Sequence, residues 1–143
     1  MIIRDLKKDD LGGLAKLYYQ FWNETTDMPD IERQFAKVQD NENYILLAAE
    51  QNDSIVGSVM GIVCDELYGD GAPFLVIENM IVDGECRKKG TGTALLAELE
   101  KRARTKNCVQ AILVTETERK DACAFYESLG FNRGVGFKKK LSD

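Results

Sequence analysis

The sequence predicts a single α+β domain in which helices pack on one β-sheet, and three observations lead to this fold class. The chain has 143 residues, 44% of them hydrophobic and 30% charged, which is typical of a compact globular domain. Several segments repeat apolar residues at helical spacing, whereas others are short runs rich in branched apolar residues. The two kinds of segment are mixed along the chain without a linker or a repeat, so one domain over residues 1–143 is expected.

The first part of the chain is expected to form a short strand and two helices. The first helix, about residues 9–23, begins with two acidic residues that suit the positive end of a helix dipole. The segment 23–30 breaks the pattern, and Pro29 is well placed in the first turn of a second helix. The apolar faces of these helices are formed by Leu11, Leu14, Leu17, Tyr18 and Phe21, and by Ile31, Phe35 and Val38.

The remaining segments complete the predicted order of elements. "NYILLAAE" (43–50) and "SIVGSVMGIVCDEL" (54–67) flank a turn-forming cluster and are expected to form an antiparallel hairpin, followed by a third strand in "PFLVIENMIVD" (73–83). A helix is expected from Thr93, a strand in "QAILVTE" (110–116), and a helix that Gly130 closes. The segment "FNRGVGFKKKL" (131–141) would end the chain as one strand or a bent pair, which gives the order β-α-α-β-β-β-α-β-α-β-β.

Composition excludes or disfavours several classes of function. The chain has no histidine, which excludes Ser-His and Cys-His nucleophiles, His-based zinc sites and imidazole acid–base catalysis. The formal net charge of −5 disfavours a general nucleic-acid binder. No apolar run approaches the ~18 residues of a membrane span, and the charged segment "MIIRDLKKDD" does not suit a signal peptide, so we expect a cytoplasmic protein. The four cysteines form no C-x-x-C pair; free thiols and no metal site are expected.

The stretch "RKKGTG" (87–92) lies between the third long strand and the helix that follows it. A strand that ends in such a loop before a helix directs unpaired backbone N–H groups and the helix dipole toward one point, where an anion can bind. Gly90 and Gly92 would let the backbone approach a phosphate, and the three preceding cations add positive charge. The sequence motif is neither that of a P-loop nor that of a dinucleotide-binding loop, and we interpret the stretch as a pyrophosphate site.

The pattern R-x-x-G-x-G in this stretch resembles the acetyl-CoA-binding signature of the GNAT superfamily of N-acetyltransferases. The segment "FLVIENMIVDGECRKKGTGTALLAELEKRA" (74–103) is similar to that family's central strand, turn and helix, and "RKDACAFYESLGF" (119–131) to its later helix. The resemblance covers nearly the whole chain. It implies a mixed, mostly antiparallel, splayed central sheet flanked by helices, with acetyl-CoA as co-substrate.

The resemblance also implies a place for each part of acetyl-CoA. The Met80 N–H would face the thioester oxygen, and the backbone of Ile81 and Val82 would hold the pantetheine arm; as an alternative, all three are ordinary core strand. Tyr126 would protonate the departing thiolate, or else only pack within its helix. Arg119 stands where many members have asparagine, and it would pair with a phosphate or be solvated. The pyrophosphate would lie over Arg87, Lys88, Lys89, Gly90, Thr91, Gly92 and Thr93.

A carboxylate is expected to take the proton of the acceptor amine. Glu78 interrupts an otherwise apolar strand, where desolvation by its neighbours would disfavour the charged form. Similar glutamates in some family members accept this proton through a water, so Glu78 is the first candidate and Glu116 the second. The alternatives for Glu78 are that it orients the substrate ammonium or that it faces solvent.

The acceptor is expected to be a primary amine of a small cationic molecule, as in the aminoglycoside-like branch that the chain resembles. In this family the segment between the first two helices flanks the acceptor site, and here it carries Trp22, Glu24 and Asp27, with Glu78 and Glu116 as further acidic contacts. Direct attack on the thioester would transfer the acetyl group. Two alternatives stay open, acetylation of a protein lysine or N-terminus and a non-catalytic acyl-CoA sensor; the assembly considered is a homodimer.

Overall fold

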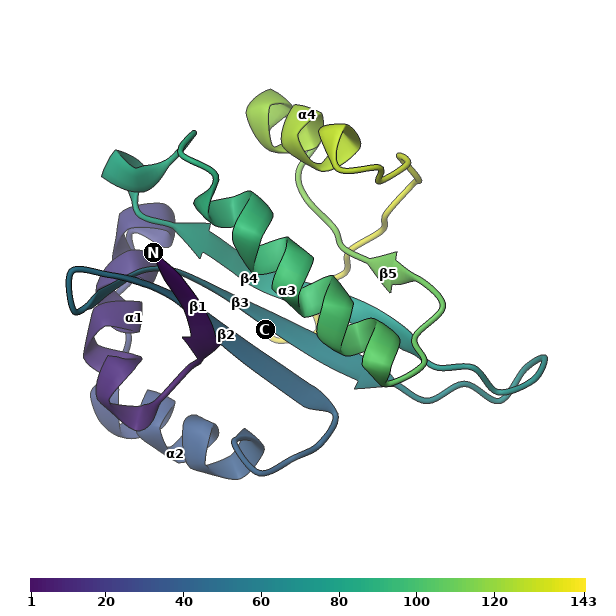
Figure 1. Cartoon of the computed structure of the whole chain (residues 1–143), viewed down its shortest axis with the longest axis horizontal. Coiled ribbons are helices and arrows are strands. Elements are labelled where there is room, and N and C mark those ends of the chain that lie inside the picture. Colours follow the sequence, from purple (N-terminus) through teal and green to yellow (C-terminus); the bar gives the residue numbers. More distant parts are fainter. The chain divides into compact units, whose positions relative to one another are not determined.

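The computed structural model describes residues 1–143, which fall into two compact units, residues 1–112 and residues 113–143. The first unit contains a five-stranded sheet in the order β1-β2-β3-β4-β5 (Figure 1). Neighbouring strands are antiparallel except for β4 and β5, which run parallel. The strands are β1 (Ile2–Asp5), β2 (Tyr44–Gln51), β3 (Ser54–Cys64), β4 (Phe74–Val82) and β5 (Ala111–Ile112). This mixed, mostly antiparallel sheet with helices confirms the predicted α+β class.

The three helices of the first unit lie close to where the sequence predicts them. Helix α1 (Leu11–Trp22) follows a short 3-10 turn and ends at a left-handed Asn23. Helix α2 (Met28–Val38) has proline in its first turn and is capped by Asp27, which accepts a hydrogen bond of 2.9 Å from the Asp30 N–H. Helix α3 (Thr91–Thr105) starts directly after Gly90. No helix of the chain is both long and apolar enough to cross a lipid bilayer.

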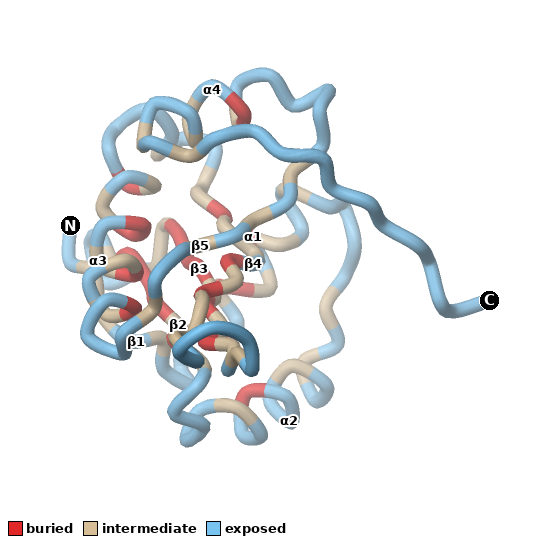
Figure 2. Tube along the Cα trace, turned by 90° about the vertical axis from the view of Figure 1, so that its right-hand side faces the viewer, coloured by how far each residue is buried: buried red, intermediate tan, exposed pale blue.

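The two faces of the sheet pack against different helices. A Cβ atom at Gly61 of β3 would lie 2.6 Å from Cδ1 of Leu99, so this glycine lets α3 approach one face closely. On the other face, Ile81 of β4 belongs to a buried cluster with residues of α1 and α2, which are Leu11, Leu14, Leu17 and Phe35. Figure 1 shows α3 along one face, and Figure 2 shows the buried residues gathered in β2–β4 and in the inner side of α3.

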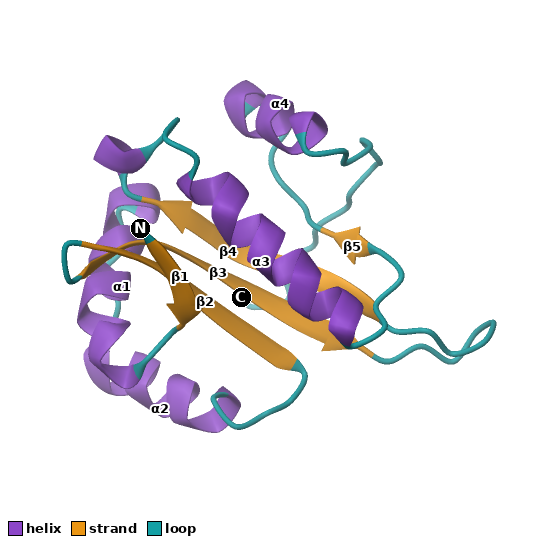
Figure 3. Ribbon diagram, viewed as in Figure 1, coloured by secondary structure: helices purple, strands orange, loops and turns teal.

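The second unit contains the predicted helix, α4 (Lys120–Ser128), followed by Gly130 at a φ of 92°. The strand predicted in 110–116 is limited to Ala111–Ile112, and the chain after Ser128 forms no strand (Figure 3). The prediction of one or two final strands is therefore wrong. A strand is stable only beside another backbone, and the glycines at 134 and 136 and the three lysines at 138–140 weaken the strand tendency of this segment.

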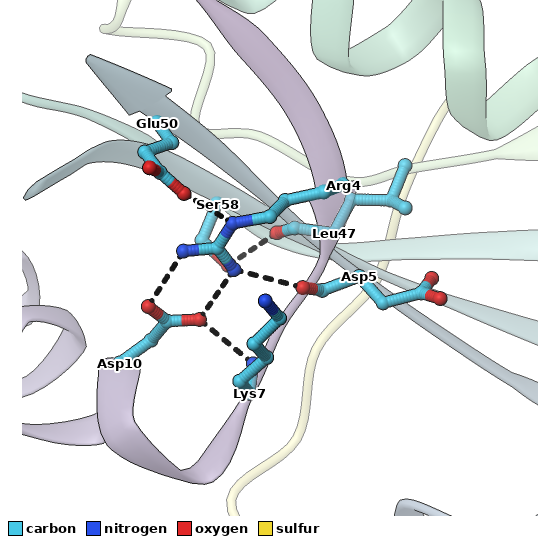
Figure 4. Close-up of polar contacts among 7 residues, drawn as sticks. All are labelled: Arg4, Asp5, Lys7, Asp10, Leu47, Glu50 and Ser58. Carbon is cyan, nitrogen blue, oxygen red and sulfur yellow. Dashed lines mark hydrogen bonds and ion pairs between the residues drawn. The ribbon is translucent and has the colours of Figure 1, made fainter. Parts of the chain in front are cut away.

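A charged cluster joins β1 to β2 and to the turn before α1 (Figure 4). Arg4 donates two hydrogen bonds to the Asp10 carboxylate, at 2.7 and 2.9 Å, and a further one to Glu50. Asp10 also accepts a hydrogen bond of 2.7 Å from the backbone N–H of Lys7. The hydrogen bond from Arg4 is the main cause that holds the pKa of Asp10 below its usual value.

An Asp10→Asn variant is expected to be less stable than the wild type at pH 7, by about 1–3 kcal/mol, because the bidentate pair with Arg4 is lost. A carboxyl whose pKa is lowered on folding stabilises the fold above the unfolded pKa of about 3.9, and this contribution is lost as the pH falls toward the folded pKa. The difference between the two proteins should therefore begin to shrink below about pH 4 and vanish below the folded pKa, as measured by urea unfolding across pH.

The matched control is Asp30→Asn, which breaks an exposed ion pair with Arg33 on α2. Exposed pairs contribute about 0–1 kcal/mol, so this variant should unfold almost as the wild type does at every pH. A loss of stability in Asp10→Asn that is the same at pH 7 and pH 3 would show that the charge of Asp10 is not what stabilises the cluster.

Candidate active site

Strand β4 contains a bulge at the position where the sequence places the thioester contact. In the pairing with β3, Ile81 lies opposite Ser58 and Glu78 opposite Met60, so Asn79 and Met80 together face a single residue. Asn79 adopts the left-handed conformation, with a φ of 51°. A bulge leaves one residue outside the regular ladder and redirects the backbone groups beside it. Met80, the predicted donor to the thioester oxygen, is thus part of the one irregular step in β4.

The bulge also changes which side of β4 faces which helix. Before it, Leu75 and Gly61 lie on the face that α3 covers, since Leu75 and Leu99 both approach the Cβ position of Gly61. After it, Ile81 packs with the α1 and α2 cluster, although Leu75 and Ile81 would share a face in a regular strand. The backbone of β4 therefore turns at Asn79 and Met80.

The edge of β4 opposite β3 is only partly used by the sheet. Strand β5 pairs with β4 at two positions, Leu75 with Ala111 and Val76 with Ile112. Residues 77–82 of β4, which include Met80, Ile81 and Val82, have no strand beside them on that edge. The family resemblance places the splay of the sheet at this edge. It leaves backbone groups available to an extended ligand, which is the arrangement that pantetheine binding requires.

The turn after β4 is held by a side chain from α1. Gln20 donates a hydrogen bond of 2.9 Å from Nε2 to Asp83 and accepts one of 3.2 Å from the Gly84 N–H. Asp83 in turn accepts a hydrogen bond of 2.8 Å from the Glu85 N–H and begins a 3-10 turn over Gly84–Cys86. The hydrogen bond from Gln20 is the main cause that lowers the pKa of Asp83. The start of the predicted pyrophosphate turn is therefore fixed to α1.

The predicted pyrophosphate turn ends at the first residue of α3. Lys88 and Gly90 both have positive φ angles, 61° and 86°, and Gly90 is the residue before the helix. No side chain caps the first turn of α3, and that turn contains no acidic residue. Without a capping side chain, the first N–H groups of α3 and the positive end of its dipole suit an anion.

The residues of this turn fit a phosphate group. A Cβ at Gly90 would meet no atom within 4 Å, so the space in front of its backbone is open. Arg87, Lys88 and Lys89 are exposed, and Nε of Arg87 donates to the Val82 carbonyl at 3.3 Å. Thr91 is buried, Gly92 is half-buried and Thr93 is exposed. The structure thus brings the predicted residues 80–82 and 87–93 together as one continuous strand, turn and helix.

Glu78 lies directly before the bulge, and its side chain is exposed. It pairs with Met60 on the face of the sheet that α1 and α2 cover in part. The expectation that apolar neighbours desolvate this carboxylate is wrong, because alternation along β4 directs it outward on that face. An exposed carboxylate can still take a proton from an amine or attract a cation. The role of Glu78 as base stays a prediction.

The predicted acceptor residues between α1 and α2 are exposed. Trp22 is the last residue of α1 and contacts the rings of Tyr18 and Phe21 edge-on, at centroid distances of 5.4 and 4.7 Å. Glu24 is exposed, whereas Asp27 caps α2. An exposed aromatic ring beside carboxylates is a suitable surface for a cation.

Tyr126 and Arg119 belong to the second unit. Tyr126 lies in α4, and its ring contacts Phe125 and Phe131 at centroid distances of 5.2 and 5.7 Å. Burial raises the pKa of the Tyr126 hydroxyl, and the charge of Arg119, the residue before α4, acts in the opposite direction. The phenol is therefore neutral at pH 7, which is the form that donates a proton. The phosphate role of Arg119 stays a prediction.

Glu116 is less suited to act as a base. Its carboxylate forms an ion pair with Lys138 within the second unit, and this hydrogen bond is the main cause that lowers the pKa of Glu116. A lowered pKa weakens a carboxylate as a proton acceptor. The second candidate is thereby disfavoured relative to Glu78.

Two residues that shape this region were not predicted from the sequence: Gln20, which holds the turn after β4, and Asn79, which lies in the bulge. The asparagine at position 79 could have indicated the bulge, since asparagine is rare within strands and tolerates the left-handed conformation. Nothing in the sequence indicated Gln20, because its place in the helix pattern is that of a surface residue.

Comparisons with known proteins agree with this geometry. The sequence pattern of the acetyltransferase (GNAT) family matches residues 10–131. A curated relative, the uncharacterized protein YdhI of Bacillus subtilis, is 29% identical over 81 residues, which are 57% of this chain and 48% of the relative, so the match spans about half of that protein.

Two solved structures share the fold at low sequence identity. A putative acetyltransferase from Agrobacterium tumefaciens superimposes with a TM-score of 0.91 at 24% identity, over 99% of this chain and 100% of the other. An aminoglycoside acetyltransferase from an uncultured soil metagenomic sample does so with a TM-score of 0.80 at 20% identity, over 99% and 96%. From the match over residues 10–131, the chain belongs to the acetyltransferase (GNAT) family, whose members use acetyl-CoA.

Proposed function

We propose that the chain transfers an acetyl group from acetyl-CoA to a primary amine of a small cationic molecule, by direct attack of the amine on the thioester. The observation that carries this proposal is the bulge at Asn79 and Met80. It lies on the part of β4 that has no strand beside it, and the same strand leads into the turn and α3. A donor for the thioester oxygen, a free edge for pantetheine and a phosphate turn thus follow one another along one segment.

Each chemical step has a candidate residue. The Met80 N–H would donate to the thioester oxygen and stabilise the negative charge that develops there. The amine nitrogen forms a bond to the acetyl carbon as the carbon–sulfur bond breaks, and the amine proton passes to Glu78 through a water. Tyr126 would give its proton to the leaving sulfur, so that the products are an acetamide and the free thiol. Arg119 would pair with a cofactor phosphate.

The acceptor is proposed to be cationic because the acceptor residues are acidic or aromatic. Trp22, Glu24 and Asp27 are exposed at the junction of α1 and α2, and Glu78 is exposed on the sheet face that carries these helices. The chain has a net charge of −5, which attracts cations over a longer range. Amino sugars of the aminoglycoside type and polyamines have this chemistry. We further propose a cytoplasmic location, and a homodimer that light scattering would detect.

The proposal is tested by following thiol release from acetyl-CoA in the presence of polyamines, aminoglycosides, amino acids and short peptides. We expect release with at least one small polyamine or aminosugar and none with neutral amino acids. Release with peptides alone would instead indicate a protein acetyltransferase. Tight binding of acetyl-CoA without release for any amine would indicate an acyl-CoA sensor.

A Glu78→Gln variant is expected to lower kcat/KM by about 10²-fold at pH 7 and much less at pH 9. At pH 9 more of the amine is already deprotonated, so the relay through Glu78 matters less. The measurement is kcat/KM for the best amine of the screen at both pH values. Glu42→Gln, which alters an exposed glutamate before β2, is the control. Equal losses at both pH values would mean that Glu78 only positions the cation, and an unchanged rate would exclude it from the mechanism.

A further inference from the structure

The start of the turn between β4 and α3 is held by hydrogen bonds from two other elements. The backbone N–H of Asp83, the first residue after β4, donates to the Val56 carbonyl of β3 at 2.8 Å. Both oxygens of the Asp83 carboxylate are bound: Oδ1 accepts from the Glu85 N–H at 2.8 Å, and Oδ2 accepts from Nε2 of Gln20 at 2.9 Å. The Gly84 N–H donates to Oε1 of the same glutamine at 3.2 Å. Gln20 therefore binds a side chain and a backbone N–H of the turn at the same time.

Gln20 reaches the turn from a helix that the core holds in place. Leu14 and Leu17 of α1 belong to the buried cluster that includes Ile81 of β4, two residues before Asp83. The helix that carries Gln20 and the strand that leads into the turn are thus attached to the same core. Gln20 itself is exposed, so its hydrogen bonds compete with water and contribute little to global stability. Their effect is local, because they fix where the turn begins.

The other end of the same segment is fixed as well. Thr91, the first residue of α3, is buried, and a Cβ at Gly57 of β3 would lie 3.3 Å from its Cγ2. Residues 84–90, which include the three cations and Gly90 of the predicted pyrophosphate turn, therefore lie between two anchored ends. A short segment has few conformations when both ends are fixed and more when one end is released.

We propose that Gln20 is a positioning residue, which holds the turn after β4 in the conformation that receives the pyrophosphate of acetyl-CoA. The proposal rests on the proposed function for the identity of the ligand, whereas the hydrogen bonds themselves do not depend on it. Without the Gln20 side chain, the turn would spend part of its time in other conformations. The affinity for acetyl-CoA would then fall in proportion to the fraction of molecules whose turn is formed.

The first test compares Gln20→Ala with Gln34→Ala. Gln34 is an exposed glutamine of α2, so its variant controls for the loss of a glutamine from a surface helix. Alanine favours the helix in both places, which keeps α1 and α2 folded. We expect acetyl-CoA to bind about fivefold more weakly to Gln20→Ala by calorimetry, and amide hydrogen exchange at Gly84 to become about fivefold faster. Both quantities should be unchanged in Gln34→Ala.

Exchanging the two side chains tests whether the hydrogen bonds are the cause. Gln20→Glu alone places a second carboxylate beside Asp83 and removes the donor, and Asp83→Asn alone removes one acceptor, so each should weaken acetyl-CoA binding by about fivefold. In Gln20→Glu combined with Asp83→Asn, the new amide can donate to the new carboxylate. The Gly84 and Glu85 N–H groups keep their acceptors, and the net charge is unchanged. Affinity should return to within about twofold of the wild type, a recovery that a general loss of stability would not show.

A shorter thioester separates the turn from the rest of the site. S-acetylpantetheine lacks the pyrophosphate, so by NMR titration it should bind equally to the wild type and to Gln20→Ala. Equal weakening for both ligands, unchanged acetyl-CoA affinity in Gln20→Ala, or no recovery in the exchanged pair would overturn the positioning role, even if the wild type acetylates an amine. Acetyl-CoA binding that depends on Gln20 as described, without thiol release for any amine, would support the positioning role and reject acetyl transfer alone.

Discussion

A Gly90→Val variant is expected to lose affinity for acetyl-CoA by about 10²-fold or more, while residues 1–112 keep their fold. Gly90 has a φ of 86°, which a β-branched residue adopts only with strain. The space in front of it is open, with no atom within 4 Å of a Cβ position, and in the proposed site the pyrophosphate occupies that space. Valine would therefore both distort the turn and fill it. Calorimetric titration with acetyl-CoA measures the loss.

The control for this prediction is Gly69→Val. Gly69 lies in the loop between β3 and β4, has a φ of 67° and also has no atom within 4 Å of a Cβ position. It carries the same kind of backbone strain without belonging to the candidate site. We expect both variants to lose similar stability, on the order of 1–3 kcal/mol, and only Gly90→Val to lose acetyl-CoA binding. Undiminished affinity in a folded Gly90→Val protein would remove the phosphate assignment.

The turn at 87–92 is the part of the candidate site whose position between a strand and a helix the sequence predicted best. A loop with glycine between a strand and a helix has few backbone solutions, so the motif at 87–92 specifies both the left-handed Gly90 and the start of α3. The hairpin of β2 and β3 was equally predictable, since Asn52 and Asp53 both adopt the positive φ angles that their residue types tolerate.

The bulge in β4 was less predictable, because Asn79 alone indicates it in the sequence. The run "FLVIENMIVD" is apolar on both sides of Glu78 and Asn79, so the change of face at this point leaves no break in the alternation. Leu75 packs beside α3, whereas Ile81 packs beside α1 and α2, and the run itself does not show which helix each residue meets. Predictions about Met80 came from the family resemblance, and they stay predictions.

The errors arose where a strand depends on its neighbours. The segment 110–116 alternates well, yet only Ala111 and Ile112 find partners on β4. Local pattern describes which side chains a strand presents, whereas strand length depends on how far two backbones remain side by side. The exposure of Glu78 has a related origin, because the helices cover only part of the sheet face on which it lies.

A Tyr126→Phe variant is expected to lower kcat by about 10²-fold with little change in acetyl-CoA affinity, which is the usual effect of removing one general acid. Phenylalanine keeps the edge-on contacts that the ring makes with Phe125 and Phe131, so α4 should fold as before. Burial raises the pKa of Tyr126, so the phenol holds its proton throughout the pH range in which the enzyme would be assayed. Turnover and acetyl-CoA binding, measured on the same preparation, separate the two effects.

The reason to expect a loss in kcat alone is that sulfur becomes a strong hydrogen-bond acceptor only as the carbon–sulfur bond breaks. A thiol has a pKa near 8.5, so the departing thiolate is basic enough to accept a proton or a strong hydrogen bond, whereas the thioester sulfur is not. The phenol would therefore act mainly in the transition state, and its removal would spare the ground-state complex. Tyr68→Phe, at a position 81% exposed in the loop after β3, controls for the loss of a phenol. Wild-type turnover in Tyr126→Phe would reduce this residue to a packing role in α4 and leave the thiolate to be protonated by water.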